Sequence, residues 1–450
     1  MSLNPPVVPE TKIKKVAMLF SGGPAPAANS VICSAAMCFS RAGIEVYGMK
    51  NGYTSLIDYK DGDVLVEGKD FLKLDYKNLE GKRSEGGIII GSARANPGKL
   101  MKTPADLTNP ETNAPMLRVY KALCSMGIDA LISIGGDDTL TTAAKFKLFQ
   151  DTLPADAKRI KVVHLPKTID NDYKGIDFTF GYFSAVDLLA TQMRNLLADA
   201  TATNCYYVAQ LMGRAAAWLS YGACIAGEAS LVIGLEDIVE QWWYEEDQID
   251  TATGETIKDA AGNALKRKVI NINALCQRMA DTVCCRLEEG KSFGTIGIAE
   301  GIGEYLPMDE LKRCVSEDEY KALKPDSFGH YPVSQLKFSS RLGRIVSDIV
   351  AQRVGKKIKF SGLQFGYEVR CHRPTAFDII LGSQLGTGAY RALVEKGIDG
   401  VMVSVSGQLE LVFPKFEDLI AMEKLRAYQR PINPDEAFHQ LARYMETWKK

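Results

Sequence analysis

The chain has 450 residues, 46% of them hydrophobic and 24% charged, and its formal net charge is −1. This composition indicates a globular protein of two or three domains, and the balanced charge gives no electrostatic reason to expect binding to nucleic acid or an anionic membrane. No apolar run approaches the roughly 18 residues of a membrane span, and the N-terminal stretch lacks the apolar core of a signal peptide. We therefore expect a cytoplasmic protein.

Cysteine and histidine usage does not suggest a metal-binding motif. The ten cysteines are scattered, no C-x-x-C occurs, and only four histidines could join them. Thiols in such apolar contexts are normally buried and reduced. We expect free thiols and no zinc site.

Short apolar runs alternate with helical stretches from residue 16 onward. A strand at 16–20 leads through a glycine turn into a buried helix at 30–43 and a second strand at 44–49. The further strands that we expect lie at 129–136, 160–167, 206–213, 229–235, 293–301, 357–366 and 400–405. Near-continuous apolar strands separated by helices indicate parallel sheets covered on both faces, and hence an α/β protein.

Two segments interrupt this rhythm. Residues 241–268 are polar and rich in turn residues, which favours an excursion with a hairpin, whereas the charged segment 304–332 favours helices with loops. Neither segment carries a chemical motif, so we interpret both as interface or lid elements.

The chemically informative loops follow predicted strands, where parallel α/β sheets bind their ligands. The first, SGGPAPAAN, turns at Gly22 and Gly23 and opens a helix, yet it is neither a Walker loop nor G-x-G-x-x-G. The second, GSARANPG, presents Arg94 between glycine and proline residues. Taken alone, each is compatible with a simple tight turn or a solvated arginine.

Two further loops concentrate charge at strand ends. IGGDDT carries Asp137 and Asp138, and PKTIDND carries Lys167, Asp170 and Asp172. A capped turn would explain one such loop. Acids and a lysine on two neighbouring strand ends instead suit phosphoryl transfer, which needs a divalent metal, a carboxylate that accepts the hydroxyl proton and a cation near the leaving group.

These loops, followed by LMGR (211–214), AEG (299–301) and FGYEVR (365–370), occur in the order found in the phosphofructokinases, which the chain resembles from residue 21 to 370. The resemblance implies two Rossmann-like three-layer α/β/α domains with the active site in the cleft between them. It places a donor- and Mg²⁺-binding domain at 12–180 plus about 366–420. A sugar-phosphate domain would take about 181–365 plus about 421–450.

The same resemblance implies transfer of a phosphoryl group to the 1-hydroxyl of fructose 6-phosphate, with Mg²⁺ as cofactor. It assigns Asp137 to the metal, Asp170 to the general base, and Thr168 to the sugar's reacting end. The other roles that it implies are donor approach at Gly23, contact with the transferring phosphoryl at Arg94, and ordering of the loop and of the metal's water at Asp172. For the sugar phosphate it implies Met212, Gly213 and Arg214 along its length, Glu300 at the hydroxyls, and Tyr367 and Arg370 at the 6-phosphate.

Asp138 and Lys167 bear on the phosphoryl donor. ATP-dependent relatives usually have glycine at the position of Asp138, which leaves room for the α-phosphate of the nucleotide. A carboxylate there would repel that phosphate by several kcal/mol at effective dielectric constants near 20. Lys167 can stabilise the phosphate that leaves pyrophosphate. Together they favour pyrophosphate in a reversible reaction of glycolysis or gluconeogenesis. An ATP-dependent enzyme is the alternative. A catalytically silent regulatory subunit is a third hypothesis, and it is disfavoured because the expected site residues are all present, namely Asp137, Thr168, Asp170 and Arg214.

The chain departs from the family in two places. Cys33 and Met37 stand where ATP-dependent bacterial members carry effector-binding arginines, so we expect no regulation by nucleotides. Asn204 and Cys205 stand where the family usually donates a basic residue across a subunit interface. A homodimer is still expected as the minimum active unit.

Overall fold

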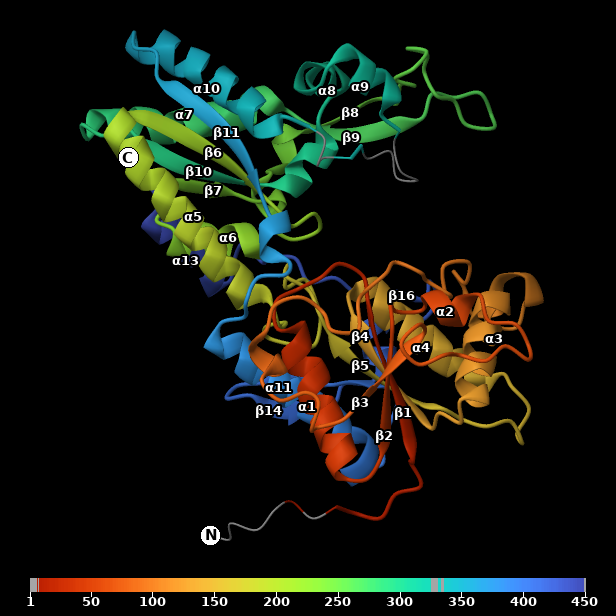
Figure 1. Ribbon diagram of the computed structural model, residues 1–450. Helices are drawn as coiled ribbons and strands as arrows, with labels where there is room; N and C mark the ends of the chain where they lie inside the picture. Colours follow the sequence, from red (N-terminus) through yellow and green to blue (C-terminus); the bar gives the residue numbers. More distant parts are fainter. Residues whose placement is uncertain (1–5, 7, 325–330, 333–335, 449–450) are drawn as a thin grey trace. The chain divides into compact units, whose positions relative to one another are not determined.

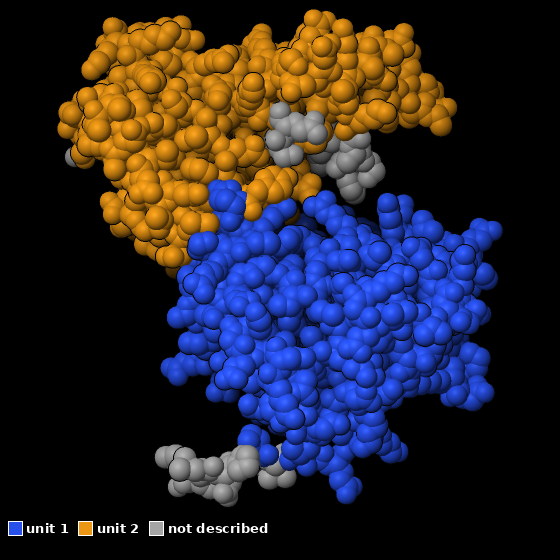
Figure 2. Space-filling model, viewed as in Figure 1, with its two compact units in different colours: residues 1–185, 368–430 blue, residues 186–367, 431–450 orange. Residues whose placement is uncertain are grey.

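The apolar run near residue 16 is a buried strand, β1 (Lys15–Ser21), inside a six-stranded sheet. The computed structural model describes residues 6, 8–324, 331–332 and 336–448. The chain divides into unit 1, Met1–Ala185 with Glu368–Arg430, and unit 2, Val186–Tyr367 with Pro431–Lys450 (Figure 2). It passes between them at 185/186, 367/368 and 430/431, whereas the sequence placed these crossings near 180, 365 and 420.

The sheet of unit 1 has the strand order β12-β5-β4-β1-β2-β3 (Figure 1). Its other strands are β2 (Glu45–Met49), β3 (Phe71–Leu74), β4 (Ala130–Gly135), β5 (Lys161–Pro166) and β12 (Val401–Met402). All neighbours pair in parallel except β3, which runs antiparallel to β2. The strands predicted for this sheet are parallel, as expected, and the antiparallel β3 is an additional edge strand that the sequence did not predict. Only the four-residue helix α2 (Thr54–Ile57) lies between β2 and β3, too short for a parallel crossover.

Helices cover both faces of this sheet, which confirms the three-layer prediction for unit 1 (Figure 1). One layer contains α1 (Ala28–Arg41) and α11 (Ala376–Tyr390), and the other contains α3 (Pro110–Ser125) and α4 (Asp137–Asp151). Glycine allows α1 and α11 to approach closely, because a Cβ added at Gly386 would lie 2.2 Å from Ser34 Oγ. The strands between the layers are almost fully buried, as their apolar sequences predicted.

Unit 2 contains a parallel four-stranded sheet in the order β11-β6-β10-β7. Its strands are β6 (Cys205–Leu211), β7 (Leu231–Ile233), β10 (Gly294–Ala299) and β11 (Lys359–Phe365). The helices α7 (Ile272–Glu288) and α10 (Phe338–Val354) lie on one face, opposite α5 (Tyr182–Thr203), α6 (Trp218–Ala226) and α13 (Ala437–Met445) (Figure 1). Unit 2 is therefore a second α/β/α sandwich.

The two predicted excursions extend unit 2. Strands β8 (Trp243–Asp247) and β9 (Lys266–Ile270) pair in antiparallel fashion, which confirms the hairpin. The second excursion contains the helices α8 (Met308–Cys314) and α9 (Glu317–Ala322). Residues 325–330 of that segment lie outside the described residues.

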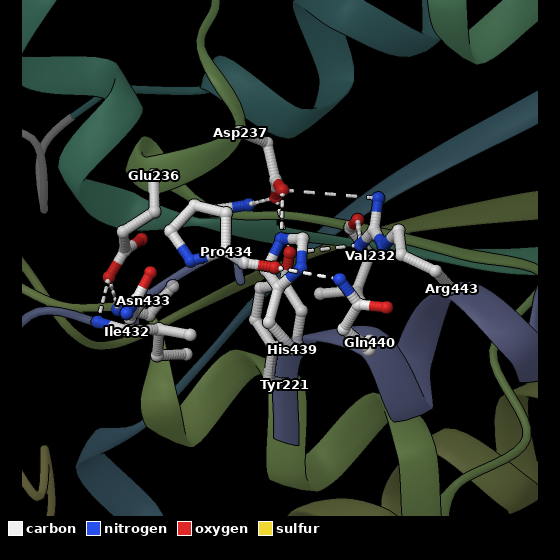
Figure 3. Close-up of polar contacts among 12 residues, drawn as sticks. Tyr221, Val232, Glu236, Asp237, Ile432, Asn433, Pro434, His439, Gln440 and Arg443 are labelled. Carbon is white, nitrogen blue, oxygen red and sulfur yellow. Dashed lines mark hydrogen bonds and ion pairs between the residues drawn. The ribbon is translucent and has the colours of Figure 1, made fainter. Parts of the chain in front are cut away.

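A buried polar network attaches the C-terminal stretch to unit 2 (Figure 3). His439 Nε2 on α13 lies 2.7 Å from Asp237 Oδ1, and the hydroxyl of Tyr221 donates to the other carboxylate oxygen at 2.5 Å. Arg443 donates to the carbonyl of Val232 at 2.7 Å. These bonds explain why residues after 430 belong to unit 2, although the sequence there carries no strand pattern.

All ten cysteines are free thiols. No helix in the described part of the chain has the length and apolar character needed to cross a membrane.

Candidate active site

The ends of three parallel strands bring the charged loops of unit 1 together. Ser21 at the end of β1 is in register with Gly135 at the end of β4, and Gly135 is in register with Pro166 at the end of β5. The loops that begin with Gly22, Gly136 and Lys167 are therefore neighbours at one sheet edge, where parallel α/β proteins bind ligands.

The first glycine turn is hydrogen-bonded to the loop that carries Arg94. Gly22, with φ of 91°, donates its N–H to the carbonyl of Ala93 at 3.0 Å, and Ser92 Oγ donates to the carbonyl of Gly22 at 2.6 Å. Arg94 follows directly and is exposed. The two loops are therefore held together, and the guanidinium of Arg94 beside them is accessible, as a contact with a phosphate requires.

Asp137 and Asp138 are the first two residues of α4, after an N-cap at Gly136. Asp137 is half-buried and Asp138 is exposed. The hydroxyl of Thr142 donates to the carbonyl of Asp138 at 2.7 Å, which fixes the first turn of the helix. Burial lowers the pKa of Lys145 in the same helix, while the charge of Asp138 opposes that shift.

Lys167 lies between the two glycine turns. Cβ atoms added at Gly22 and Gly136 would lie 3.8 and 3.9 Å from its Nζ, so even alanine at either position would contact the ammonium group. Its side chain is buried, and burial lowers the pKa of the amine. The negative charges of Asp170, Asp172 and Asp137 act in the opposite direction and favour the ammonium form.

The loop that carries these acids is held by bonds within it. Thr168 Oγ1 accepts from the N–H of Asp170 at 3.0 Å, and the carbonyl of Thr168 accepts from the hydroxyl of Thr179 at 2.7 Å. Buried Asn171 has a φ of 53°, a conformation that asparagine tolerates, and its Oδ1 accepts from the N–H of Thr179 at 2.9 Å. The sequence analysis assigned no role to Asn171, although its place between Asp170 and Asp172 was a signal for one.

Arg430, the last residue of unit 1 in the sequence, stabilises the same loop. Its backbone N–H donates to the carbonyl of Asp172 at 2.8 Å, and its guanidinium donates to the carbonyl of Asn171 at 2.9 Å. Sequence reasoning did not identify this residue, because an arginine in a polar stretch carries no local sign of a partner 259 residues away.

The acids of unit 1 form a carboxylate-rich environment. Burial raises the pKa of Asp172 to about 7, and the charges of Asp170 and Asp137 add to this effect. Within the described residues no group of three or more His, Cys, Asp or Glu side chains is arranged to hold a metal ion. Mg²⁺ usually binds through one or two carboxylates together with water and substrate phosphates. A single half-buried carboxylate such as Asp137, at the end of β4, therefore suits Mg²⁺ delivered with a phosphorylated substrate.

In unit 2 the predicted sugar-phosphate residues also lie at the carboxyl ends of neighbouring parallel strands. Leu211 at the end of β6 is in register with Ala299 at the end of β10 and with Phe365 at the end of β11. The residues that follow these ends are the predicted sugar-phosphate residues Met212, Gly213, Arg214, Glu300 and Tyr367. This juxtaposition lies entirely within unit 2.

Two glycines make the close approach of these loops possible. A Cβ at Gly301 would lie 2.2 Å from the carbonyl oxygen of Arg214, and one at Gly366 would lie 2.2 Å from Cγ of Met212. Gly366 also has a φ of 148°, which few other residues adopt. The packing explains the glycine that follows Glu300 and the one that precedes Tyr367.

The charged groups of this set differ in exposure. The side chain of Arg214 is 71% exposed and lies 3.8 Å from Glu304, whereas Glu300 is buried and Tyr367 is exposed. Arg370 belongs to unit 1, where a Cβ at Gly23 would lie 4.0 Å from its Cζ and its charge acts on Lys167. Within unit 1, Arg370 thus lies near the glycine turn at Gly23 and acts on the buried Lys167.

The two departures from the family have clear locations. Cys33 is buried in α1, where burial raises the pKa of its thiol to about 12, and Met37 lies in the same helix. Asn204 and Cys205 lie at the start of β6, at the opposite end of that strand from Met212. Asn204 accepts a hydrogen bond from Ser292 Oγ at 2.8 Å.

Two α/β sandwiches that gather glycines, acids and cations at the carboxyl ends of parallel strands have the architecture of proteins that bind phosphorylated ligands. The family model described as Phosphofructokinase matches residues 15–393, and the chain belongs to the phosphofructokinase family.

Relatives with two different names are similar to this chain. It is 30% identical to the pyrophosphate–fructose 6-phosphate 1-phosphotransferases of Naegleria fowleri (98% of this chain, 89% of the relative) and Thermotoga maritima (90% and 84%). It is 27% identical to the ATP-dependent 6-phosphofructokinase of Corynebacterium efficiens (94% and 99%). Overall identity therefore does not distinguish the donor.

Solved structures show the same fold. The pyrophosphate-dependent phosphofructokinase of Nitrosospira multiformis matches with a TM-score of 0.62 at 14% identity, over 97% of this chain and 93% of that one. The phosphofructokinase of Pichia pastoris matches with a TM-score of 0.62 at 22% identity, over 93% of this chain but only 37% of that one.

Proposed function

We propose that this protein transfers a phosphoryl group from pyrophosphate to the 1-hydroxyl of fructose 6-phosphate and releases phosphate. The choice of donor rests on the exposed Asp138 at the start of α4, together with the buried Lys167 that follows β5. Pyrophosphate has no third phosphate to meet the Asp138 carboxylate, whereas ATP would bring its α-phosphate toward that charge. Two relatives at 30% identity are named pyrophosphate–fructose 6-phosphate 1-phosphotransferases, but the choice against ATP rests on Asp138 and Lys167, because overall identity does not distinguish the donor.

In this proposal the residues of unit 1 carry the chemistry. Asp170 accepts the proton of the 1-hydroxyl as that oxygen attacks, and Thr168, bonded to the N–H of Asp170, lies at the same reacting end of the sugar. Lys167 stabilises the departing phosphate, and the exposed Arg94 contacts the transferring phosphoryl group. Mg²⁺, when bound at Asp137, neutralises phosphate oxygens. Asp172 orders the loop, and Gly23 lets the donor approach the backbone.

The sugar phosphate is assigned to unit 2 together with Arg370. Met212, Gly213 and the exposed Arg214 line the sugar phosphate, and Glu300 accepts from sugar hydroxyls. Tyr367 and Arg370 bind the 6-phosphate, where a guanidinium fork suits a phosphate dianion. Since Arg370 lies beside Gly23, its charge also favours anionic groups at the donor loops.

An ATP-dependent 6-phosphofructokinase is the second candidate, supported by the relative at 27% identity. Rates of fructose 1,6-bisphosphate formation with Mg²⁺ and equal concentrations of either donor separate the two. The proposal expects turnover with pyrophosphate and little with ATP. Turnover with ATP alone would reject pyrophosphate as donor, and no turnover with either would favour a silent sugar-phosphate-binding subunit.

Three further parts of the proposal have separate tests. Because pyrophosphate hydrolysis releases less free energy than ATP hydrolysis typically delivers, the reaction should run in both directions, as phosphate-dependent loss of fructose 1,6-bisphosphate would show. ADP or phosphoenolpyruvate at millimolar concentration should leave the rate unchanged, since Cys33 and Met37 offer no cation. Light scattering should show a homodimer, and cell fractionation should place the enzyme in the cytoplasm.

A further inference from the structure

A buried histidine and tyrosine lie directly beneath the two acidic loops of unit 1. Ser133 on β4 is in register with His164 on β5, and Tyr173 follows the PKTIDND loop. The accessible surface of His164 is 0%, and that of Tyr173 is 2%. The two rings stack with centroids 6.1 Å apart. A polar pair this deep in an α/β core needs hydrogen-bond partners, since unpaired polar groups are costly there.

The hydrogen bonds of this pair form a chain in which each donor points toward the carbonyl of Gly135. Burial lowers the pKa of His164 to about 3, so its imidazole is neutral and has one donor and one acceptor nitrogen. Tyr173 Oη donates its proton to the carbonyl of Gly135 at 2.8 Å. His164 Nε2, 3.1 Å from that oxygen, must then be the donor, which leaves Nδ1 to accept from Ser133 Oγ at 3.4 Å.

The end of this chain is the carbonyl that connects the two loops. Gly135 O also accepts the backbone N–H of Lys167 at 2.9 Å. One oxygen thus binds both the first residue of the 167–173 loop and its last. It is also the last carbonyl of β4 before the turn that carries Asp137. Loss of the tyrosine hydroxyl would remove the bond that joins the far end of the loop to the Asp137 turn, while the bonds from Arg430 to Asn171 and Asp172 would remain.

We propose that Tyr173, oriented by His164, is a positioning residue that holds the 167–172 loop against the Asp137 turn. The inference rests on the proposed phosphoryl transfer, because that loop carries Lys167 and Asp170. Phenylalanine would fill the same volume, so the hydroxyl is the functional part. A misplacement of a reacting group by about 1 Å can lower the rate about 100-fold.

Tyr173→Phe removes only this hydroxyl, and Tyr120→Phe is its matched control. Tyr120 lies in the same unit, and its hydroxyl donates to the carbonyl of Lys158 at 2.9 Å. Lys158 precedes β5, at the opposite end of that strand from the 167–172 loop. We expect Tyr173→Phe to lower kcat by about 10- to 100-fold with KM for fructose 6-phosphate within about twofold of wild type. Tyr120→Phe should retain wild-type kcat.

Hydrogen exchange provides a readout that does not depend on activity. In Tyr173→Phe, amides of the peptide spanning 167–173 should exchange faster, whereas Tyr120→Phe should leave that peptide unchanged. Faster exchange with unchanged kcat, or unchanged exchange with reduced kcat, would overturn the proposal. If the wild type transfers no phosphoryl group, the proposed function fails, and the exchange comparison still decides whether Tyr173 holds the loop.

Two variants of His164 test the orienting step. The amide nitrogen of glutamine can replace the Nε2 donor, whereas the shorter asparagine cannot reach Tyr173 Oη. We expect His164→Gln to keep kcat within about fivefold of wild type and His164→Asn to resemble Tyr173→Phe. Equal activities of the two folded variants would remove His164 from the proposal.

Discussion

Replacement of Asp138 by glycine should give this enzyme activity with ATP. Two unit charges 4 Å apart repel by about 4 kcal/mol at an effective dielectric constant of 20, which corresponds to about 1000-fold in affinity. Because Asp138 is exposed, water and salt weaken this repulsion, and we expect an increase of about 100-fold in kcat/KM for ATP. Asp138→Asn removes the charge and keeps the volume, so its increase should be smaller.

A control variant distinguishes an effect of the substitution on donor choice from its effect on helix stability. An acidic residue in the first helical turn contributes about 0.3–1 kcal/mol, and glycine costs about 1 kcal/mol more, so Asp138→Gly should melt a few degrees lower. Asp309→Gly is the matched control, since Asp309 is also an exposed aspartate at the second position of a helix. Steady-state kinetics with both donors should show a changed donor ratio only for the Asp138 variants. An unchanged ratio in folded, pyrophosphate-active Asp138→Gly would show that the Asp138 carboxylate does not exclude ATP.

Three other substitutions test the remaining roles. Asp170→Asn should lower kcat by about 100-fold or more while calorimetry shows retained fructose 6-phosphate binding, and near-wild-type turnover would contradict its role as base. Lys167→Met keeps a buried chain without the ammonium and should lower kcat with pyrophosphate by about 100-fold, so an unchanged kcat would remove Lys167 from leaving-group stabilisation. Burial raises the pKa of Glu446 to about 7. The folded protein therefore binds a proton at this carboxyl more tightly than the unfolded chain does, and the free energy of unfolding should fall as pH rises from about 5 to 8. Thermal melts of wild type against Glu446→Gln should diverge over that range by up to about 3 kcal/mol, and parallel curves would contradict the assignment.

Much of the fold could be predicted because both sheets are buried on both faces. Continuous apolar runs such as 129–136 and 160–167 had to be interior strands, and the intervening helices required parallel pairing. β3 was not predicted, because its partly exposed four-residue run resembles a loop. Its antiparallel direction follows from the absence of a crossover helix between β2 and β3. Local patterns do not reveal such topological details.

The site was predictable where motif and strand end coincide. Asp137, Lys167 and Asp170 follow strands whose register alone brings them together. The supporting residues were not predictable in the same way. Tyr173 reaches Gly135 across 38 residues, and Arg430 reaches Asn171 across 259, through contacts that only the folded sheet defines. A buried histidine inside an apolar strand was the one available signal for the pair beneath the loops.

Competition between the two donors in one reaction shows which of them this enzyme uses. Wild-type enzyme with Mg²⁺ and fructose 6-phosphate would receive pyrophosphate and ATP together at equal concentration, and ³¹P NMR would follow both donors. The account predicts that the pyrophosphate signal declines as phosphate and fructose 1,6-bisphosphate appear, while the three ATP signals stay constant. Loss of the ATP γ-phosphate signal with pyrophosphate unchanged would contradict it.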